Sequence, residues 1–388
     1  MNNVYVVSGA RTAIGKANRG TLVNYRPDDM AAEVMKAAVD RAGIKPEQVQ
    51  DIVLGCAIPE QSQGMNMARI AALRAGMPDT VSALTINRFC SSGLEAMVIA
   101  AAKISSGLFD IAIGGGAESM SMVHGPGARP APNPWLTKNL PETYIAMGNA
   151  GDNVARDFKF SRQELDEWAL GSNQKAVAAI DLGKFKDQIV PLQVPLNGNG
   201  KTITFDTDEG PRRETTLEGL LALKPAFAAS PANGFHTAGN SSQMSDGAAA
   251  CVLMSEKGMK DTGAKPLAKL IGYNVAAGSP KYLGPAQLIA IPKAVEIAGI
   301  KLSDVGLFEV NEAFSSVALL VIRELKLDPK KVNVNGGAIA LGHPLGCSGA
   351  KLSVQIIDEM RKRGEKYGVV TMCIGGGMGA AGVFELCE

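Results

Sequence analysis

The chain has 388 residues, of which 46% are hydrophobic and 20% charged, so it is long enough for more than one domain and has an ordinary globular composition. Its 39 basic and 38 acidic residues give a formal charge of +1, which does not support a nucleic-acid or membrane-surface partner. No apolar run reaches the roughly 18 residues of a membrane-spanning helix, no signal peptide is evident, and six cysteines are too few for a disulfide scaffold. We therefore expect a cytoplasmic protein.

The first 120 residues alternate predicted strands and helices. An apolar N-terminal run precedes a helix that has Pro27 at its start, Asp28 and Asp29 in its first turn and Gly43 as its stop. The apolar run 51–55 then predicts a strand. This alternation is typical of an α/β fold whose sheets are covered by helices.

A cysteine stands at a predicted helix start in Asn-Arg-Phe-Cys-Ser-Ser-Gly (87–93), because apolar residues follow Cys90 at helical spacing. A helix N-terminus favours the thiolate by about 1 kcal/mol, which is less than one pKa unit, so a nucleophilic thiol here would need a base. The alternative is a buried structural cysteine.

Residues 121–250 form a predicted insert. It contains a proline- and glycine-rich stretch at 125–134, a helix opened by the capping box Ser161–Glu164 and a return strand at 248–254. The polar turn 237–242 precedes this strand and is either an ordinary loop or a contact for the amides of a ligand. We expect the insert to supply specificity loops.

The last 120 residues repeat landmarks of the first. Ala-Gly-Ile-Lys occurs at 42–45 and at 298–301, an offset of 256, and the cysteine motif at Cys90 has a counterpart at Cys347, an offset of 257. We also pair the Gly-Gly-Gly run at 114–116 with that at 375–377, an offset of 261. Residues 1–120 and 268–388 are therefore predicted to be two copies of one α/β unit.

Three motifs in the second copy carry candidate chemistry. His343, between Gly342 and Pro344, is predicted to lie in a fixed turn and is either a general base or a loop histidine. Cys373 ends an apolar strand before three glycines and is either an acid/base thiol or a buried one. Asn311 follows a strand, and its side chain could hold a water or a carbonyl oxygen. Alternatively it caps the next helix, which is the interpretation that the residue alone favours.

Other assignments of these residues are weaker. Cys347 is expected to pack in the core at a helix start. The cysteines and histidines have no metal-ligand spacing, so we expect no metal site. The glycine-rich segments do not match a nucleotide-binding loop.

These segments resemble the thiolase family over essentially the whole chain. The segment that begins at Ser8 resembles the family's N-terminal strand and turn, and those around Cys90, His343 and Cys373 resemble its three signature regions. Asn311-Glu-Ala-Phe resembles its fourth active-site element. The resemblance implies a duplicated five-layer αβαβα core with an inserted loop domain.

The resemblance also implies a role for each residue in covalent acyl transfer. Cys90 is the nucleophile, His343 activates it, and Cys373 protonates the departing acetyl-CoA carbanion or deprotonates acetyl-CoA in the reverse condensation. One oxyanion hole is a water on Asn311 together with His343, and the other is formed by the backbone N–H groups of Cys90 and Gly375.

Coenzyme A and acyl-CoA are implied as substrates, with no permanently bound cofactor. Arg212 matches a family position near the adenine nucleotide, Phe227 one beside the pantetheine, and Ser242 one that hydrogen-bonds the pantetheine. A homodimer or homotetramer is implied, with no nucleic-acid or membrane partner.

Two departures favour a degradative 3-ketoacyl-CoA thiolase over a biosynthetic acetoacetyl-CoA thiolase. The biosynthetic enzymes have His-Met-Gly where this chain has Ala146-Met-Gly, and they have a serine where this chain has Gly219. A non-catalytic CoA- or lipid-binding relative is disfavoured because the four catalytic positions are intact. A ketoacyl synthase is disfavoured because it has no second catalytic cysteine like Cys373.

Overall fold

The computed structural model describes residues 3–123, 131–196, 200–227 and 234–387. Residues 125–130 of the proline- and glycine-rich stretch lie outside this part. Within the described residues, no helix combines the length and the apolar character that a membrane crossing requires.

The first half of the chain builds one side of the main sheet. Its strands lie in the order β4-β3-β5-β9-β1, with β4, β3 and β5 parallel and β9 antiparallel to both β5 and β1. The bounds are β1 (Tyr5–Thr12), β3 (Asp51–Gly55), β4 (Ser82–Ile86), β5 (Ile111–Ser119) and β9 (Ser245–Met254). The predicted return strand is therefore confirmed, because β9 fills the place between β5 and β1.

The second half repeats this arrangement in the order β11-β12-β13-β10, with β11 and β12 parallel and β13 antiparallel to both β12 and β10. The bounds are β10 (Ala268–Ala277), β11 (Leu307–Val310), β12 (Tyr367–Ile374) and β13 (Met378–Leu386). Two residue pairs between β1 and β10 join the two halves.

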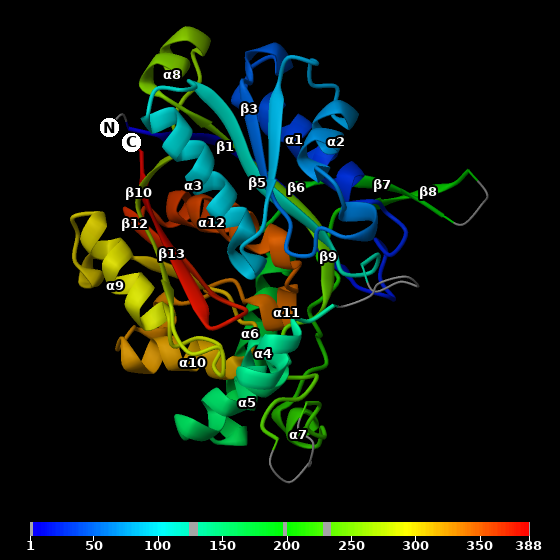
Figure 1. The fold of residues 1–388 in the computed structure, drawn as a ribbon, viewed down its shortest axis with the longest axis vertical. Helices are drawn as coiled ribbons and strands as arrows, with labels where there is room; N and C mark the ends of the chain where they lie inside the picture. Colours follow the sequence, from blue (N-terminus) through cyan, green and yellow to red (C-terminus); the bar gives the residue numbers. More distant parts are fainter. Residues whose placement is uncertain (1–2, 124–130, 197–199, 228–233, 388) are drawn as a thin grey trace.

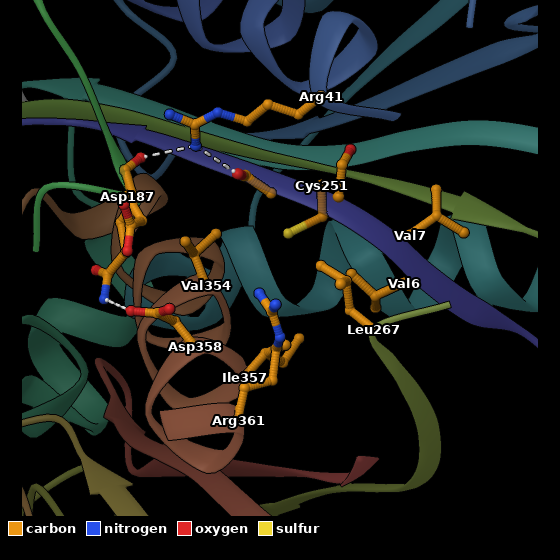
Figure 2. Close-up of a pocket in the computed structure, with 13 residues that line it drawn as sticks. Val6, Val7, Arg41, Asp187, Cys251, Leu267, Val354, Ile357, Asp358 and Arg361 are labelled. Carbon is orange, nitrogen blue, oxygen red and sulfur yellow. Dashed lines mark hydrogen bonds between the residues drawn. The ribbon is translucent and has the colours of Figure 1, made fainter. Parts of the chain in front are cut away.

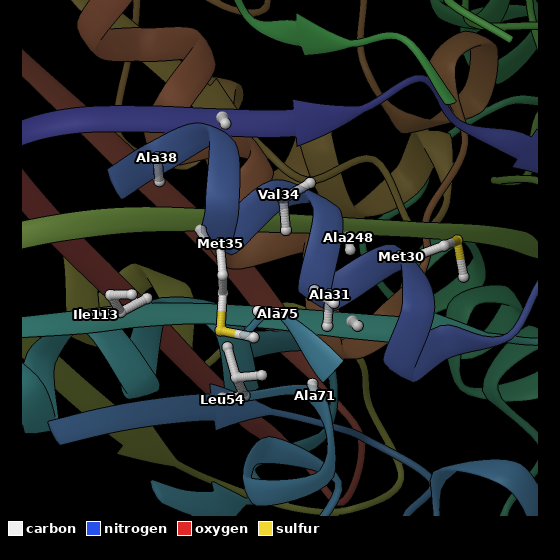
Figure 3. Packing of buried hydrophobic residues seen from close by; sticks show 14 of the residues in the cluster. Met30, Ala31, Val34, Met35, Ala38, Leu54, Ala71, Ala75, Ile113 and Ala248 are labelled. Atoms are coloured by element: carbon white, nitrogen blue, oxygen red, sulfur yellow. The ribbon is translucent and has the colours of Figure 1, made fainter. Parts of the chain in front are cut away.

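Helices cover both halves and also lie between them, which gives five layers (Figure 1). On the outer face of the first half lie α1 (Pro27–Ala42) and α2 (Met67–Arg74), and Figure 3 shows Met35 of α1 directed toward Leu54 and Ala75. The central layer is α3 (Ser92–Ser105) and α12 (Leu345–Arg363), and the far layer is α9 (Gln287–Ile297) and α10 (Ser315–Glu324).

The alternation of side chains along a strand builds these layers. On β12, Val370 and Met372 pack into the central layer, whereas Val369 packs toward α9 and α10. Strands buried on both faces read as continuous apolar runs, which is why the sequence shows no polar alternation there.

The strand registers confirm a duplicated topology but correct one landmark. β3 pairs Asp51 with Ala112 and β11 pairs Leu307 with Gly368, so equivalent strands lie 256 residues apart (307 − 51 and 368 − 112). The two Gly-Gly-Gly runs, which are 261 residues apart, are therefore not equivalent, and pairing them was wrong. Residues 114–116 lie inside β5, whereas Gly376 and Gly377 take positive φ values of 81° and 80° in the turn after β12.

The insert packs beside this core. Its elements are α4 (Pro134–Asn139), α5 (Met147–Asp157), α6 (Arg162–Asp181), β6 (Ile189–Val190), β7 (Leu192–Pro195), β8 (Thr202–Phe205) and α7 (Leu217–Leu221). The capping box that opens α6 is present, as predicted. The remaining short elements are β2 (Gly15–Lys16), α8 (Glu256–Thr262) and α11 (Ala338–Leu341).

Candidate active site

Cys90 lies in a short 3₁₀ turn (Phe89–Ser91) that leads directly into α3. Burial raises the pKa of its thiol to about 12, although the backbone N–H groups of Gly375 and of Cys90 itself act in the opposite direction. Desolvation therefore outweighs the helix N-terminus, and the resting thiol is neutral. Phe89 has a φ of 43°, a backbone conformation that large side chains rarely adopt and that occurs at functional sites.

A glycine contact joins the starts of the two central helices. A Cβ added to Gly93 would lie 2.7 Å from the backbone nitrogen of Ala350 and 2.8 Å from the carbonyl oxygen of Gly346. Only glycine permits this approach of α3 to α12. This contact holds the segment that carries Cys90 against the start of α12, and α12 begins two residues after His343.

His343 lies in a turn between α11 and α12, as predicted, and is 4% exposed. Its Nδ1 lies 2.5 Å from Ser348 Oγ, and this hydroxyl donates to the carbonyl of Pro344 at 3.0 Å. The network therefore places the ring proton on Nδ1 and leaves a lone pair on Nε2, 3.3 Å from Asn311 Nδ2. Burial, followed by the charge of Lys351, lowers the pKa of His343 to about 3, so the imidazole is a neutral acceptor.

Asn311 directly follows β11 and is 1% exposed. The helix-cap interpretation was wrong, because the N-cap of α10 is Phe314 and no side chain caps it. The backbone N–H of Asn311 instead donates to the carbonyl of Thr371 on β12, which directs the amide side chain to His343.

Cys373 lies near the end of β12 and is fully buried. Burial, together with the neighbouring Cys90, raises the pKa of its thiol well above the ordinary value. The backbone N–H of Gly375, two residues on, lowers the pKa of the Cys90 thiol and so favours its thiolate. A Cβ added to Gly375 would meet Met147 Sδ at 3.5 Å and Phe89 Cδ2 at 3.7 Å, so these two side chains flank the Gly375 position.

Two of the three predicted CoA contacts lie beside this site. The ring of Phe227 packs edge-on against Phe314, with centroids 5.7 Å apart, and the backbone N–H of Ser242 donates to the carbonyl of Ala313 at 2.9 Å. Arg212 lies elsewhere on the insert, where its backbone N–H donates to Asn173 and its side chain lines surface hollows beside α6 and α7.

Glu118, at the end of β5, was missed by the sequence analysis. Its fully buried carboxylate accepts hydrogen bonds from the backbone N–H groups of Ala57, Ile58 and Gly346 at 2.8, 3.2 and 2.7 Å, and from Gln63 Nε2 at 2.5 Å. It therefore ties the loop after β3 to the start of α12. A lone acidic residue after an apolar strand was the available signal.

A buried histidine–aspartate pair was also missed. His236 Nδ1 lies 2.8 Å from Asp152 Oδ1, and the histidine ring packs edge-on against Phe314 at 4.9 Å between centroids. Burial lowers the pKa of His236, and within the described residues its Nε2 and Asp152 Oδ2 have no hydrogen-bond partner. The carbonyl of His236 accepts from the N–H of Ala226, so the pair ties α5 to the backbone beside Phe227.

Two family models together match nearly the whole chain. Residues 4–257 match the N-terminal domain of thiolase and residues 264–386 match its C-terminal domain.

Relatives cover the chain from end to end. It is 50% identical to a 3-ketoacyl-CoA thiolase of Bacillus subtilis over the full length of both proteins, and 43% identical to the human peroxisomal 3-ketoacyl-CoA thiolase over 99% of this chain and 91% of that protein. The crystal structure of the Bacillus anthracis acetyl-CoA acetyltransferase superposes with a TM-score of 0.90 at 41% identity, over 100% of this chain and 99% of that one. The chain is therefore an acyltransferase that belongs to the thiolase family.

Proposed function

We propose that the protein is a 3-ketoacyl-CoA thiolase that cleaves 3-ketoacyl-CoA with CoA, through an acyl group held on Cys90, in the β-oxidation of fatty acids. The observation that carries this proposal is the pair of neighbouring buried thiols. Cys90 comes from the first half and Cys373 from the second, both thiols are buried, Cys90 raises the pKa of the Cys373 thiol, and the backbone N–H of Gly375 favours the thiolate of Cys90. A single acyl transfer needs one nucleophile, whereas breaking a carbon–carbon bond also needs a proton donor for the departing carbon.

In the first half-reaction the Cys90 sulfur attacks the 3-keto carbonyl, and its proton passes to Nε2 of His343. Negative charge develops on the 3-keto oxygen when the sulfur adds and on the thioester oxygen when the carbon–carbon bond breaks. The two candidate sets of preorganised donors for these oxygens are the N–H groups of Gly375 and Cys90, and a water on Asn311 together with His343. Each such donor contributes about 10²–10³ in rate.

The bond between C2 and C3 then breaks. Cys373 gives its proton to C2, so acetyl-CoA leaves and the shortened acyl group remains on Cys90 as a thioester. In the second half-reaction the incoming CoA thiol loses its proton to the Cys373 thiolate, attacks the thioester and carries the acyl group away. The sulfur of Cys90 recovers its proton from His343, which closes the ping-pong cycle.

Three features support the degradative assignment. Ala146 occupies the position at which the biosynthetic enzymes have a histidine. The side chains of Met147 and Phe89, which flank Gly375, are apolar. Two relatives, at 50% and 43% identity, are named 3-ketoacyl-CoA thiolases. The second candidate function is that of an acetoacetyl-CoA thiolase, which condenses two acetyl-CoA molecules. This candidate is favoured by the structural neighbour from Bacillus anthracis, which is named an acetyl-CoA acetyltransferase.

For the substrate and for assembly we propose the following arrangement. CoA lies along the insert, with the pantetheine at Phe227 and Ser242 and the adenine nucleotide near Arg212. The chain is a homo-oligomer, which is supported by the sheet ending at β4 and by exposed apolar side chains there, including Leu84 and Leu73.

We also propose three parts of the chain and a cytoplasmic location. The three-part division into 1–120, 121–250 and 268–388 is supported by the repeated strand order and by the position of β9. A cytoplasmic, reducing setting is supported by six free cysteines, including both candidate catalytic thiols.

A substrate panel tests the proposal. Cleavage rates with CoA are measured for 3-ketoacyl-CoAs of graded chain length, and acetyl-CoA condensation is measured beside them. We expect kcat/KM to be higher for chains longer than acetoacetyl-CoA. Activity confined to acetoacetyl-CoA would establish the biosynthetic candidate, and no cleavage of any member would overturn both.

A further inference from the structure

A cavity of about 220 Å³ lies away from the candidate active site, where the two halves and the insert meet (Figure 2). It is smaller than the roughly 300–1,000 Å³ of pockets for drug-sized ligands, so its occupant is small. Its walls come from the start of β1, the end of α1, the second half of α12 and the segment before β6.

The floor of the cavity is apolar. It is formed by Val6, Cys251, Leu267, Val354 and Ile357. Burial raises the pKa of Cys251 to about 12, so this thiol is neutral and behaves as a small apolar side chain.

The rim carries two guanidinium groups, Arg41 and Arg361, that form no ion pair with a described residue, although Asp187 and Asp358 lie close enough to act on the charge of Arg41. Arg41 donates to the carbonyl oxygens of Gly9, Gln188 and Ile189 at 2.8, 3.1 and 3.3 Å, and none of the described carboxylates lies within 4 Å of it. Arg361 is exposed and makes no hydrogen bond or ion pair with any described residue, and Figure 2 shows it extending from α12 toward the strands.

The two carboxylates at the rim already face other groups. Asp358 accepts from Gln188 Nε2 at 2.7 Å and from Lys362 Nζ at 2.8 Å, and Asp187 lies 3.7 Å from the same ammonium. With Lys362 included, three cations face two carboxylates. The charge that remains to be paired is therefore positive.

We propose that this cavity binds a short unbranched carboxylate, with its apolar chain on the floor and its carboxylate on the guanidinium of Arg361. Arg41 supplies a second positive charge at the rim. A planar guanidinium can pair both oxygens of a carboxylate, whereas an unbranched chain fits the apolar floor. The site is separate from the acyl-transfer chemistry and does not depend on the proposed function.

Calorimetric titration with octanoate tests the proposal. Octanoate is expected to bind saturably, and neither acetate, which lacks the chain, nor octylamine, which reverses the charge, is expected to match it. Arg361→Ala should weaken octanoate binding at least about tenfold, because a charge-assisted hydrogen bond is lost. Arg361→Lys, which keeps the charge but cannot pair both oxygens, should bind octanoate with an affinity between those of the wild type and Arg361→Ala. Lys260→Ala, which removes a distant exposed cation on α8, is the matched control and should bind like the wild type.

The location is read from methyl resonances of labelled isoleucines in the same protein. Octanoate should shift Ile357 in the cavity. A shift confined to Ile145, which packs against the hydrophobic cluster that contains Cys373, would overturn the proposal and leave the proposed function intact. Equal octanoate affinity in the wild type and in Arg361→Ala, or no saturable binding, would overturn it as well.

Discussion

Each half of the molecule carries a cysteine near the start of its central helix, and the two cysteines have different surroundings. Cys90 precedes α3 and Cys347 lies in the first turn of α12, and these two helices form the central layer. The backbone N–H of Gly375 favours the thiolate of Cys90, whereas Cys347 is fully buried in the central hydrophobic cluster. Duplication thus supplies two similar helix starts, and the turn around each cysteine decides which one faces a reaction site.

Exchanging the two cysteines for alanine should give the largest contrast. Cys90→Ala removes the proposed nucleophile, so turnover should fall by more than about 10⁴-fold. Cys347→Ala should keep activity within a few-fold and cost about 1 kcal/mol of unfolding free energy, because it removes one small buried group. Steady-state rates and denaturant titrations check both, and comparable activity losses would contradict the distinction.

The serines that follow these cysteines allow a second matched test. Ser348 fixes the proton on Nδ1 of His343, whereas Ser91 only hydrogen-bonds the carbonyl of Arg88. Ser348→Ala should lower kcat by about tenfold, the equivalent of one strong hydrogen bond. Ser91→Ala should stay within about threefold under the same assay, and equal effects would remove Ser348 from the positioning of the base.

Two aspartates on α5 sharpen the contrast between the insert and the core. Asp152→Asn disturbs the buried pair with His236, so the KM for CoA should rise about three- to tenfold with kcat within about twofold. Asp157→Asn, on the exposed side of the same helix, is the control and should change neither constant. A selective fall in kcat for Asp152→Asn would place the pair in the chemistry instead.

The pH profile should show the smallest change. The lowered pKa of His343, about 3, keeps its Nε2 unprotonated as the pH falls, and the raised pKa of Cys90, about 12, keeps the thiol protonated as it rises. The kcat/KM should therefore stay nearly constant from about pH 5 to 9. An acid limb with an apparent pKa near the ordinary value of about 6.5 would contradict the neutral buried base.

The sequence predicted the parts of the site that depend on local patterns. Cys90 at a helix start, His343 in a turn and Cys373 at a strand end follow from glycine, proline and apolar spacing, and the duplication follows from the offset of 256 residues. The three-dimensional pairing of these segments was not readable from spacing alone. It depends on close approaches such as that of Gly93 to α12.

Residues that act through long-range contacts were the ones missed. Glu118 and its partner Gly346 lie 228 residues apart, and His236 and Asp152 lie 84 apart, so no local pattern links them. The two Gly-Gly-Gly runs were wrongly paired because they share a local pattern and not a place in the fold. Glycine is suited both to a close backbone approach inside a strand and to a turn with positive φ, so the same Gly-Gly-Gly sequence lies at different positions in the two copies.

One labelling experiment tests most directly the separate roles that we propose for the two thiols, Cys90 and Cys373. Cys373→Ala protein is mixed with radiolabelled acetyl-CoA, and the labelled peptide and the thiolysis rate are measured together. The proposed mechanism predicts close to one acetyl group per chain on the Cys90 peptide and loss of turnover. Near-normal turnover, or a label on a peptide without Cys90, would contradict it.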